Sequence, residues 1–388
     1  MRLYNVSRFW LAVGCVGLVV FGLLIGLGTA FIGLNQAENL FEVVSLIRSN
    51  YIEEASLKQL LNGATKGIVD SLDDPYSVYL EPKTYQHLKE QIRGSFGGLG
   101  IVVGIRDEQL TVIRPFPDTP AGRAGIKAGD VIVKIGDHRV EGLDLETAVN
   151  LMRGPVGTKV TITIMRQGSK PLQVTLTREE ISVPSVEGKL LPEKIGYISV
   201  AQFTEKTPHE LSKVINDLRN KGMRAVILDL RDNPGGELNA AVAVADNFVP
   251  KGPVVYVRYR EGRDEVHKAD AYRLSLPLVV LVNENSASAA EIVAGAVKDT
   301  GAGVVMGVRT YGKGVVQTVY DLKNGAGLKL TTAKYLTPKK RDINNKGVEP
   351  DVKVEQPVDA QTDVQLSAAQ ARLYKDLNEH ALPKAAGE

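Results

Sequence analysis

The sequence of 388 residues predicts a multidomain α+β protein, and three changes of pattern along the chain carry that prediction. Residues 37–93 place apolar side chains at helical spacing. Residues 94–181 consist of short β-branched runs separated by glycine and proline. Residues 182–355 alternate apolar strands with helices, which is typical of an α/β layer with crossover connections. Residues 1–36 form an apolar N-terminal segment, and residues 356–388 form a polar, partly helical tail.

The composition is that of a globular protein, and it excludes two classes of site. The 47 basic residues nearly balance the 45 acidic ones, so no basic face for nucleic acid is indicated. The single cysteine, Cys15, lies in the N-terminal apolar segment, so no disulfide or paired-cysteine metal site can form in the rest of the chain. A His-Glu-x-x-His pattern is also absent from the sequence, and we expect no metal and no cofactor.

The N-terminal segment predicts a membrane anchor. From Phe9 to Leu34 there is no charged residue, and this run is longer than the ~20 residues that a helix needs to cross a bilayer. Because Arg2 and Arg8 precede the run, the positive-inside rule keeps the N-terminus in the cytoplasm and exports the rest. We expect a single-pass protein of the cell membrane whose later domains lie in the periplasm or at the cell surface. The alternatives are a cleaved signal peptide and a lipoprotein site at Cys15.

The helical segment contains two apolar stripes, one that includes Leu40 and Val43 and one that includes Leu57 and Leu61. The sequence Asp-Asp-Pro-Tyr at residues 73–76 ends the second helix, because proline disfavours helix at the residue before it. A third helix is expected over Thr84–Ile92. The segment is either a spacer or a dimerisation surface, and the second possibility would make the protein a homo-oligomer.

The two later domains have distinct sets of expected elements. The first contains strands over Ile101–Val103, Leu110–Ile113, Val131–Ile135, Val160–Met165 and Gln173–Thr177, with a helix over Asp144–Met152. The second contains strands over Ile195–Val200, Ala225–Leu230, Val254–Val257, Leu278–Val282 and Val304–Gly307, with helices over Pro208–Asn220, Glu237–Phe248 and Ser288–Lys298. A short helix is expected in the tail over Val364–Glu379.

The first of these domains opens on a glycine-rich turn, Gly-Gly-Leu-Gly-Ile at residues 97–101. Residues 120–130 then read Pro-Ala-Gly-Arg-Ala-Gly-Ile-Lys-Ala-Gly-Asp, and the combination resembles a PDZ domain rather than a glycine-rich hairpin of an unrelated β domain. Backbone N–H groups of such a turn can bind a terminal carboxylate, while the next strand edge accepts a peptide by β-addition. The residues expected to bind protein or peptide C-terminal tails are Gly98, Leu99, Gly100 and Ile101.

A candidate nucleophile lies between an apolar strand and an alanine-rich helix. Residues 285–291 read Asn-Ser-Ala-Ser-Ala-Ala-Glu, which places Ser288 at the positive end of a helix dipole, where a developing anion is stabilised. Ser288 and Glu291 also match a capping box, and Ser286 could equally cap the helix. Taken alone, this segment favours a helix cap over a nucleophile.

Lys313 supplies the base that such a serine would need. It lies between two glycines in an apolar setting, and the glycines leave the amine room to reach a partner. Burial disfavours the charged form of a lysine, so a buried Lys313 could accept the proton of Ser288. The alternative is a surface lysine in a glycine loop.

A second strand-to-helix turn reads Asp-Leu-Arg-Asp-Asn-Pro-Gly-Gly at residues 229–236. The N–H groups of Gly235 and Gly236 suit an oxyanion hole, with the N–H of Ala289 as a further donor. A tight turn before a helix has the same composition, and the sequence does not separate the two interpretations.

Together these motifs resemble the carboxyl-terminal processing peptidases, from the helical segment to Gly-Val-Glu-Pro-Asp at residues 347–351. The resemblance implies a core of the crotonase/ClpP type and cleavage near the C-terminal end of protein substrates. It makes Ser288 the nucleophile, Lys313 the base and Gln317 the residue that orients the base. It further implies that the PDZ domain presents the tail and gates the site, and Arg153 matches the family's gating arginine.

This interpretation requires a particular backbone geometry, and two alternative functions remain open. On a regular strand, four residues span ~13 Å, so the backbone between Lys313 and Gln317 must turn or bulge. A serine–histidine–aspartate hydrolase is one rival, although the five histidines lie in no motif-like setting. A membrane-tethered PDZ scaffold on an inactive peptidase core is the other.

Overall fold

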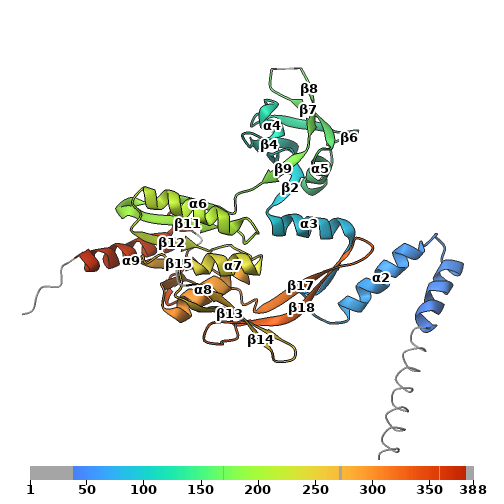
Figure 1. The fold of residues 1–388 in the computed structure, drawn as a ribbon. Coiled ribbons are helices and arrows are strands. Elements are labelled where there is room, and N and C mark those ends of the chain that lie inside the picture. The colour runs from blue at the N-terminus through green and yellow to red at the C-terminus, as the bar shows by residue number, and fades with distance from the viewer. Residues whose placement is uncertain (1–37, 169, 271–272, 358, 382–388) are drawn as a thin grey trace, which may run out of the picture. The chain divides into compact units, whose positions relative to one another are not determined.

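The computed structural model describes residues 38–381 apart from residues 169, 271–272 and 358 (Figure 1). The chain divides into two compact units between Tyr79 and Leu80. The predicted membrane anchor, Phe9–Leu34, lies outside the described residues. Among the residues that are described, no helix is both long and apolar enough to cross a bilayer.

The first unit is helical, as its apolar spacing predicts. Residues 38–50 form one helix, and α2 (Leu57–Asp70) forms another. Ser56 caps α2 by accepting a hydrogen bond from the Gln59 N–H at 3.2 Å. The helices of this unit leave large apolar side chains exposed, among them Leu40, Phe41, Val43, Leu46, Leu57, Leu61 and Ile68.

The second unit begins with α3 (Pro82–Arg93), where the third helix was expected, and continues into a β-rich domain. Its strands are β2 (Ser95–Gly98), β3 (Ile101–Arg106), β4 (Gln109–Pro115), β5 (Val131–Ile135), β6 (His138–Arg139), β7 (Lys159–Met165), β8 (Leu172–Thr177) and β9 (Glu179–Ser182). The main sheet has the order β3-β4-β5-β7-β8, so β3 is an outer strand, and β2 pairs with β9 separately. Two helices complete the domain, α4 (Pro120–Arg123) and α5 (Leu145–Met152).

The last domain, which we call the core, is built on a sheet with the order β10-β11-β12-β15-β16-β19. These strands are β10 (Val186–Leu190), β11 (Ile195–Val200), β12 (Ala225–Asp229), β15 (Leu278–Val282), β16 (Val304–Gly307) and β19 (Val352–Lys353). From β11 onward the strands run parallel, and only β10 is antiparallel to its neighbour. Because β12 and β15 are parallel neighbours, the loops that leave their carboxyl ends emerge at the same edge of the sheet.

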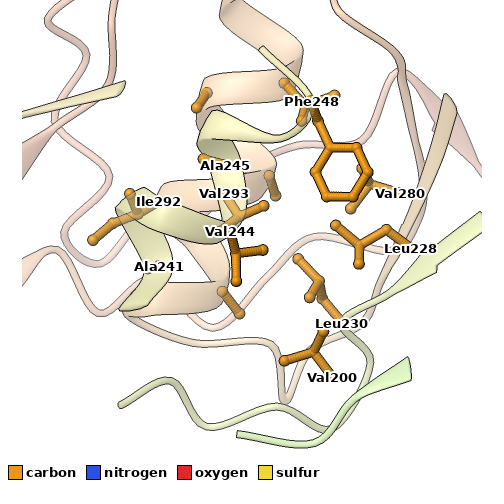
Figure 2. Packing of buried hydrophobic residues seen from close by; sticks show 14 of the residues in the cluster. Val200, Leu228, Leu230, Ala241, Val244, Ala245, Phe248, Val280, Ile292 and Val293 are labelled. Carbon is orange, nitrogen blue, oxygen red and sulfur yellow. The ribbon is translucent and has the colours of Figure 1, made fainter. Parts of the chain in front are cut away.

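Helices bury both faces of this sheet, which explains its unbroken apolar strands. Val226 and Leu228 of β12 pack with residues of α6 (Thr207–Asn220), α7 (Leu238–Asp246) and α8 (Ala289–Thr300). Figure 2 shows part of this layer, with Leu228 and Val280 facing the side chains of α7 and α8. The alternate residues Ala225 and Ile227 belong to the opposite layer, which is covered by α9 (Val364–Ala381).

A second, antiparallel sheet joins four strands of the core: β13 (Gly252–Tyr259), β14 (Asp264–Ala269), β17 (Val315–Asp321) and β18 (Gly327–Leu336). β18 lies between β17 and β13, and β14 pairs with the other edge of β13. The ladder between β17 and β18 shifts register between Val316 and Gln317. The pairing skips Thr332, so the extra residue lies on β18, and the turn or bulge expected between Lys313 and Gln317 stays a prediction.

Candidate active site

Ser288 directly precedes α8 at the end of the turn that leaves β15. It is 7% exposed, and its backbone has φ 53° and ψ −111°. An ordinary N-cap residue lies in the β region, whereas a positive φ is rare for a serine and costs on the order of 1–3 kcal/mol. Ser288 thus holds the N-cap position in a strained conformation that capping alone does not require, which favours a functional role over a plain cap.

The carboxylate of Glu291 connects the serine turn to the lysine loop. Oε2 accepts hydrogen bonds from the backbone N–H of Ser288 at 2.8 Å and of Lys313 at 2.9 Å. Oε1 accepts the Thr310 hydroxyl at 2.6 Å and the Gly312 N–H at 2.8 Å. Glu291 is fully buried, so all four donors are paired away from water. One carboxylate oxygen therefore holds the backbones of both predicted reacting residues.

The glycine loop at residues 230–236 packs directly against the serine. Gly235 has φ 100°, and a Cβ atom there would lie 2.8 Å from the Ser288 Cβ and 3.0 Å from the Ala289 N. A Cβ on Gly236 would lie 1.9 Å from the Phe203 carbonyl oxygen. Only glycine therefore fits at either position. The N–H of Gly235 donates to the Asn233 side chain at 2.8 Å, while the N–H groups of Gly236 and Ala289 donate to no acceptor in the described part of the chain.

Further hydrogen bonds join the glycine loop to the serine turn. The Asp232 N–H donates to Asn283 Oδ1 at 2.9 Å, and the amides of Asn283 and Asn285 both donate to Asp232 Oδ1 at 2.8 Å. The Ser286 hydroxyl donates to the Leu230 carbonyl oxygen at 2.7 Å. Ser286, the alternative cap, thus stabilises the turn and does not cap α8.

Lys313 and Gln317 lie at the start of the antiparallel sheet. Lys313 is half-buried and lies two residues before β17, while Gln317 is the third residue of β17. The Gln317 amide donates to the Val315 carbonyl oxygen at 3.4 Å and to the Thr331 hydroxyl at 3.5 Å. The structure thus places Gln317 in the strand pairing, and its predicted role in orienting Lys313 stays a prediction.

Tyr335 of β18 was not singled out from the sequence, yet it also belongs to this site. Its N–H donates to the Gly314 carbonyl oxygen at 2.8 Å, next to Lys313. Burial raises the pKa of its phenol to about 12, and a hydrogen bond with the Ser288 side chain opposes that rise. A neutral phenol therefore lies beside the serine. A tyrosine in a strand carries no sequence signal that marks it as part of a site.

Comparison with known proteins assigns the chain to a family. The model of peptidase family S41 matches residues 194–354, that of a PDZ domain matches residues 111–166, and that of the N-terminal domain of the activating protease CtpB matches residues 29–84. The chain is 38% identical to the carboxy-terminal processing protease CtpA of Bacillus subtilis over 336 residues, 86% of this chain and 72% of that protein. This chain belongs to the carboxy-terminal processing proteases.

Other relatives agree with this assignment. A carboxy-terminal-processing protease of Bartonella bacilliformis is 40% identical over 326 residues, 82% of this chain and 74% of that protein. Among solved structures, an S41 protease of Bacteroides fragilis matches with a TM-score of 0.50 and 16% identity, over 86% of this chain and 96% of that chain. At that identity, the structural match shows the fold alone.

In this carboxy-terminal processing protease, the PDZ residues predicted to bind tails run from Gly98, the last residue of β2, to Ile101, the first residue of β3. Gly100 has φ 76°, and a Cβ atom there would lie 2.2 Å from the Thr119 Cβ. The carbonyl oxygens of Leu99 and Gly100 accept the N–H groups of Ala121 and Phe116, which fixes the turn. Leu99 is only 2% exposed and packs in the domain core, whereas Ile101 is partly buried at the start of β3.

Arg153, the predicted gating residue of the protease, follows α5 directly. Its guanidinium lies over the Phe96 ring, 4.1 Å from the ring centroid. Its Nε is buried and has no hydrogen-bond partner among the described residues. The stacking ties α5 to β2, and the gating role stays a prediction.

The four histidines whose side chains the structure describes lie on four different elements of the protease. His87, His138, His209 and His267 lie on α3, β6, α6 and β14, respectively. No hydrogen bond joins any of these four side chains to Ser288. The side chain of His380 lies outside what the structure describes.

Proposed function

We propose that this C-terminal processing serine protease cleaves with a Ser288–Lys313 dyad. The observation that carries the proposal is the Glu291 carboxylate, whose Oε2 binds the backbone N–H groups of both residues. A neutral Lys313 amine accepts the Ser288 hydroxyl proton as the oxygen attacks the scissile carbonyl carbon. The amine then gives that proton to the departing C-terminal fragment. Water cleaves the acyl-serine ester with Lys313 as base, and the proton returns to Ser288.

The oxyanion of each tetrahedral intermediate would bind to backbone N–H groups beside the serine. Ala289 at the start of α8 supplies one donor, and the dipole of α8 adds to it. Gly236 is the better second donor, because the N–H of Gly235 donates to Asn233. The alternating strands and helices that hold these loops are consistent with a core of the crotonase/ClpP type.

The PDZ domain is proposed to bind the free C-terminal tail of the substrate at Gly98–Ile101. Two observations support this: β3 is an outer strand whose free edge has no partner among the described strands, and α5 lies against it. A tail could add to β3 as a further strand, with its carboxylate at the N–H groups of the glycine turn. Arg153 would couple an occupied PDZ domain to the core.

Peptides with a free C-terminal carboxylate should be cleaved about 10- to 100-fold faster, in kcat/KM, than the same peptides with an amidated terminus. A lost charge-assisted hydrogen bond is worth roughly 1.5–3 kcal/mol. Gly100→Ala should abolish this preference, because its Cβ would overlap Thr119. Gly125→Ala is the matched control: its φ of 73° is equally positive, but nothing lies within 4 Å of the added Cβ. Equal cleavage of both peptides by the wild type would remove the PDZ domain from recognition.

We further propose that Phe9–Leu34 anchors the protease in the cell membrane with its catalytic domain outside the cytoplasm. The uncharged run and the preceding arginines support this topology. Fractionation should recover the full-length protease with the membrane; a soluble protein beginning after about Leu34 would show a cleaved signal instead.

The protease is also proposed to form a homo-oligomer, because the exposed apolar side chains of the first unit suit a contact between copies of the chain.

A further inference from the structure

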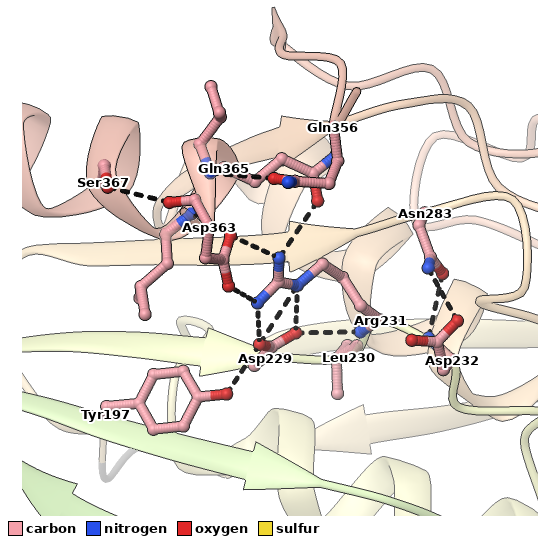
Figure 3. A network of polar contacts seen from close by, with 12 residues as sticks. Tyr197, Asp229, Leu230, Arg231, Asp232, Asn283, Gln356, Asp363, Gln365 and Ser367 are labelled. Carbon is pink, nitrogen blue, oxygen red and sulfur yellow. Dashed lines mark hydrogen bonds and ion pairs between the residues drawn. The ribbon is translucent and has the colours of Figure 1, made fainter. Parts of the chain in front are cut away.

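Arg231 connects the glycine loop to the C-terminal segment of the chain (Figure 3). Its guanidinium forms paired hydrogen bonds with two carboxylates. On one side, Nε and Nη2 donate to Asp229, the last residue of β12, at 3.0 and 2.6 Å. On the other, Nη1 and Nη2 each donate to one oxygen of Asp363 at 2.8 Å. Nη1 also donates to the Gln365 amide oxygen at 3.2 Å. The Arg231 side chain is only 14% exposed, so these contacts are largely shielded from water.

Asp363 and Gln365, the partners of Arg231 in the C-terminal segment, are themselves held in place by further hydrogen bonds. Asp363 precedes α9 and also accepts the Leu366 N–H at 2.8 Å, so the same carboxylate caps the helix. Gln365 is 2% exposed and donates to the Val354 carbonyl oxygen at 2.8 Å. Although burial favours the neutral acid, the hydrogen bonds from Arg231 hold the pKa of Asp363 below its ordinary value. Asp363 is therefore an ionised, fixed partner for Arg231.

The residues that follow Arg231 in the glycine loop are bonded to the turn that carries Ser288. The residue after Arg231 is Asp232, which has φ 57° and is bonded to the serine turn through Asn283. Asn233 donates to the Val200 carbonyl oxygen and accepts the Gly235 N–H. The loop has no helix or strand of its own between β12 and α7. Backbone bonds help to position it: the Asn233 carbonyl oxygen accepts the Ala287 N–H at 2.9 Å, and the Gly235 carbonyl oxygen accepts the Phe203 N–H at 3.0 Å. Side-chain contacts add to these bonds, and Arg231 supplies the contact with Asp363 and Gln365 at the start of α9.

We propose that Asp363, assisted by Gln365, is a positioning residue of the protease: through Arg231 it holds the glycine loop where the oxyanion forms. This inference rests on the proposed Ser288 chemistry. The C-terminal segment would then serve catalysis, as well as covering the sheet. A loop displaced by a fraction of an ångström donates poorly to the oxyanion but leaves substrate binding intact. Loss of the Asp363 contact should therefore lower kcat and leave KM nearly unchanged.

The test compares Asp363→Ala and Asp363→Asn with Glu379→Gln, which removes an exposed carboxylate of α9 that pairs with Lys375. Two quantities are measured for each purified full-length variant. One is the kcat and KM for a peptide substrate. The other is the affinity for a peptidyl boronic acid of the same sequence, which forms a tetrahedral adduct with an active-site serine.

Asp363→Ala should lower kcat about tenfold with KM nearly unchanged, and the affinity for the boronic acid should fall by the same factor. Asp363→Asn should show the same pattern more weakly, because the amide oxygen still accepts one hydrogen bond, and Glu379→Gln should match the wild type. The asparagine variant preserves shape, so it decides the matter if the alanine variant does not fold. Unchanged kcat and boronate affinity in both Asp363 variants, with Ser288→Ala inactive, would overturn this inference alone. Full activity of Ser288→Ala would overturn the dyad and this inference together.

Discussion

Lys313→Arg should lower kcat by about 10²–10⁴-fold, the usual contribution of a general base, even though it keeps the positive charge. A guanidinium stays protonated at any usable pH, so it cannot accept the Ser288 proton. The Lys313 amine can, and the rate of the wild type should rise with pH as that amine loses its proton. The measurement is kcat over a pH series for a free-carboxylate peptide.

The matched control for this substitution is Lys298→Arg. Lys298 lies on α8 and pairs with Asp351 at 2.7 Å, so arginine can keep its ion pair. That variant should have wild-type activity. Normal cleavage by Lys313→Arg, together with loss of activity on substitution of one histidine, would replace the dyad with a histidine-based triad.

Glu291→Gln should reduce kcat by roughly 100-fold and destabilise the fold. The amide has one acceptor oxygen, so its NH₂ group must face two of the four donors that the carboxylate now satisfies. Each buried donor left without a partner costs about 1–3 kcal/mol, and relief of that cost moves Ser288 away from Lys313. Steady-state kinetics and thermal unfolding measure the two effects.

Glu210→Gln is the matched control, because it removes a hydrogen-bonded carboxylate that contacts neither Ser288 nor Lys313. Glu210 accepts the N–H and hydroxyl of Ser185, each at 2.7 Å, and its carboxylate bonds with neither reacting residue. This variant should lose some stability and keep its kcat. If Glu291→Gln also keeps its kcat, the carboxylate has no part in aligning the dyad.

The buried strands of the core could be predicted from the sequence almost to the residue. Ile195–Val200, Leu278–Val282 and Val304–Gly307 were expected as strands and are β11, β15 and β16. Their apolar, β-branched runs have one stable solution, a parallel strand covered on both faces. The helix expected over Val364–Glu379 is also present, as the longer α9.

The antiparallel hairpin of β17 and β18 was not predicted, because its residues are mostly half-buried and β17, Val-Val-Gln-Thr-Val-Tyr-Asp, shows neither a continuous apolar run nor a strict polar–apolar alternation. Apolar sequence patterns reveal strands that are buried, whereas half-buried strands such as these are stabilised mainly by pairing with each other. A turn or bulge between Lys313 and Gln317 was expected only because two predicted site residues had to come closer than a regular strand allows, whereas the extra residue of this hairpin is Thr332 on β18.

The sequence predicted the reacting residues of the candidate site, but it did not predict the residues that hold them in position. Glu291 was interpreted as a capping residue, and its bonds to Thr310, Gly312 and Lys313 come from a loop about twenty residues later. Asp363 lies 132 residues after Arg231, and no local pattern connects them. Long-range polar contacts leave little local signal. A charged residue within the buried run of α8 was the one clue to Glu291.

The most direct test of the dyad measures cleavage of one free-carboxylate peptide by Ser288→Ala, Lys313→Ala and the double variant. Residues that act as one unit lose almost all of their contribution when either is removed, so their effects do not add. The account predicts that each single variant is inactive and that the double variant is hardly worse than either. Substantial cleavage by Ser288→Ala, or single losses that multiply in the double variant, would contradict it.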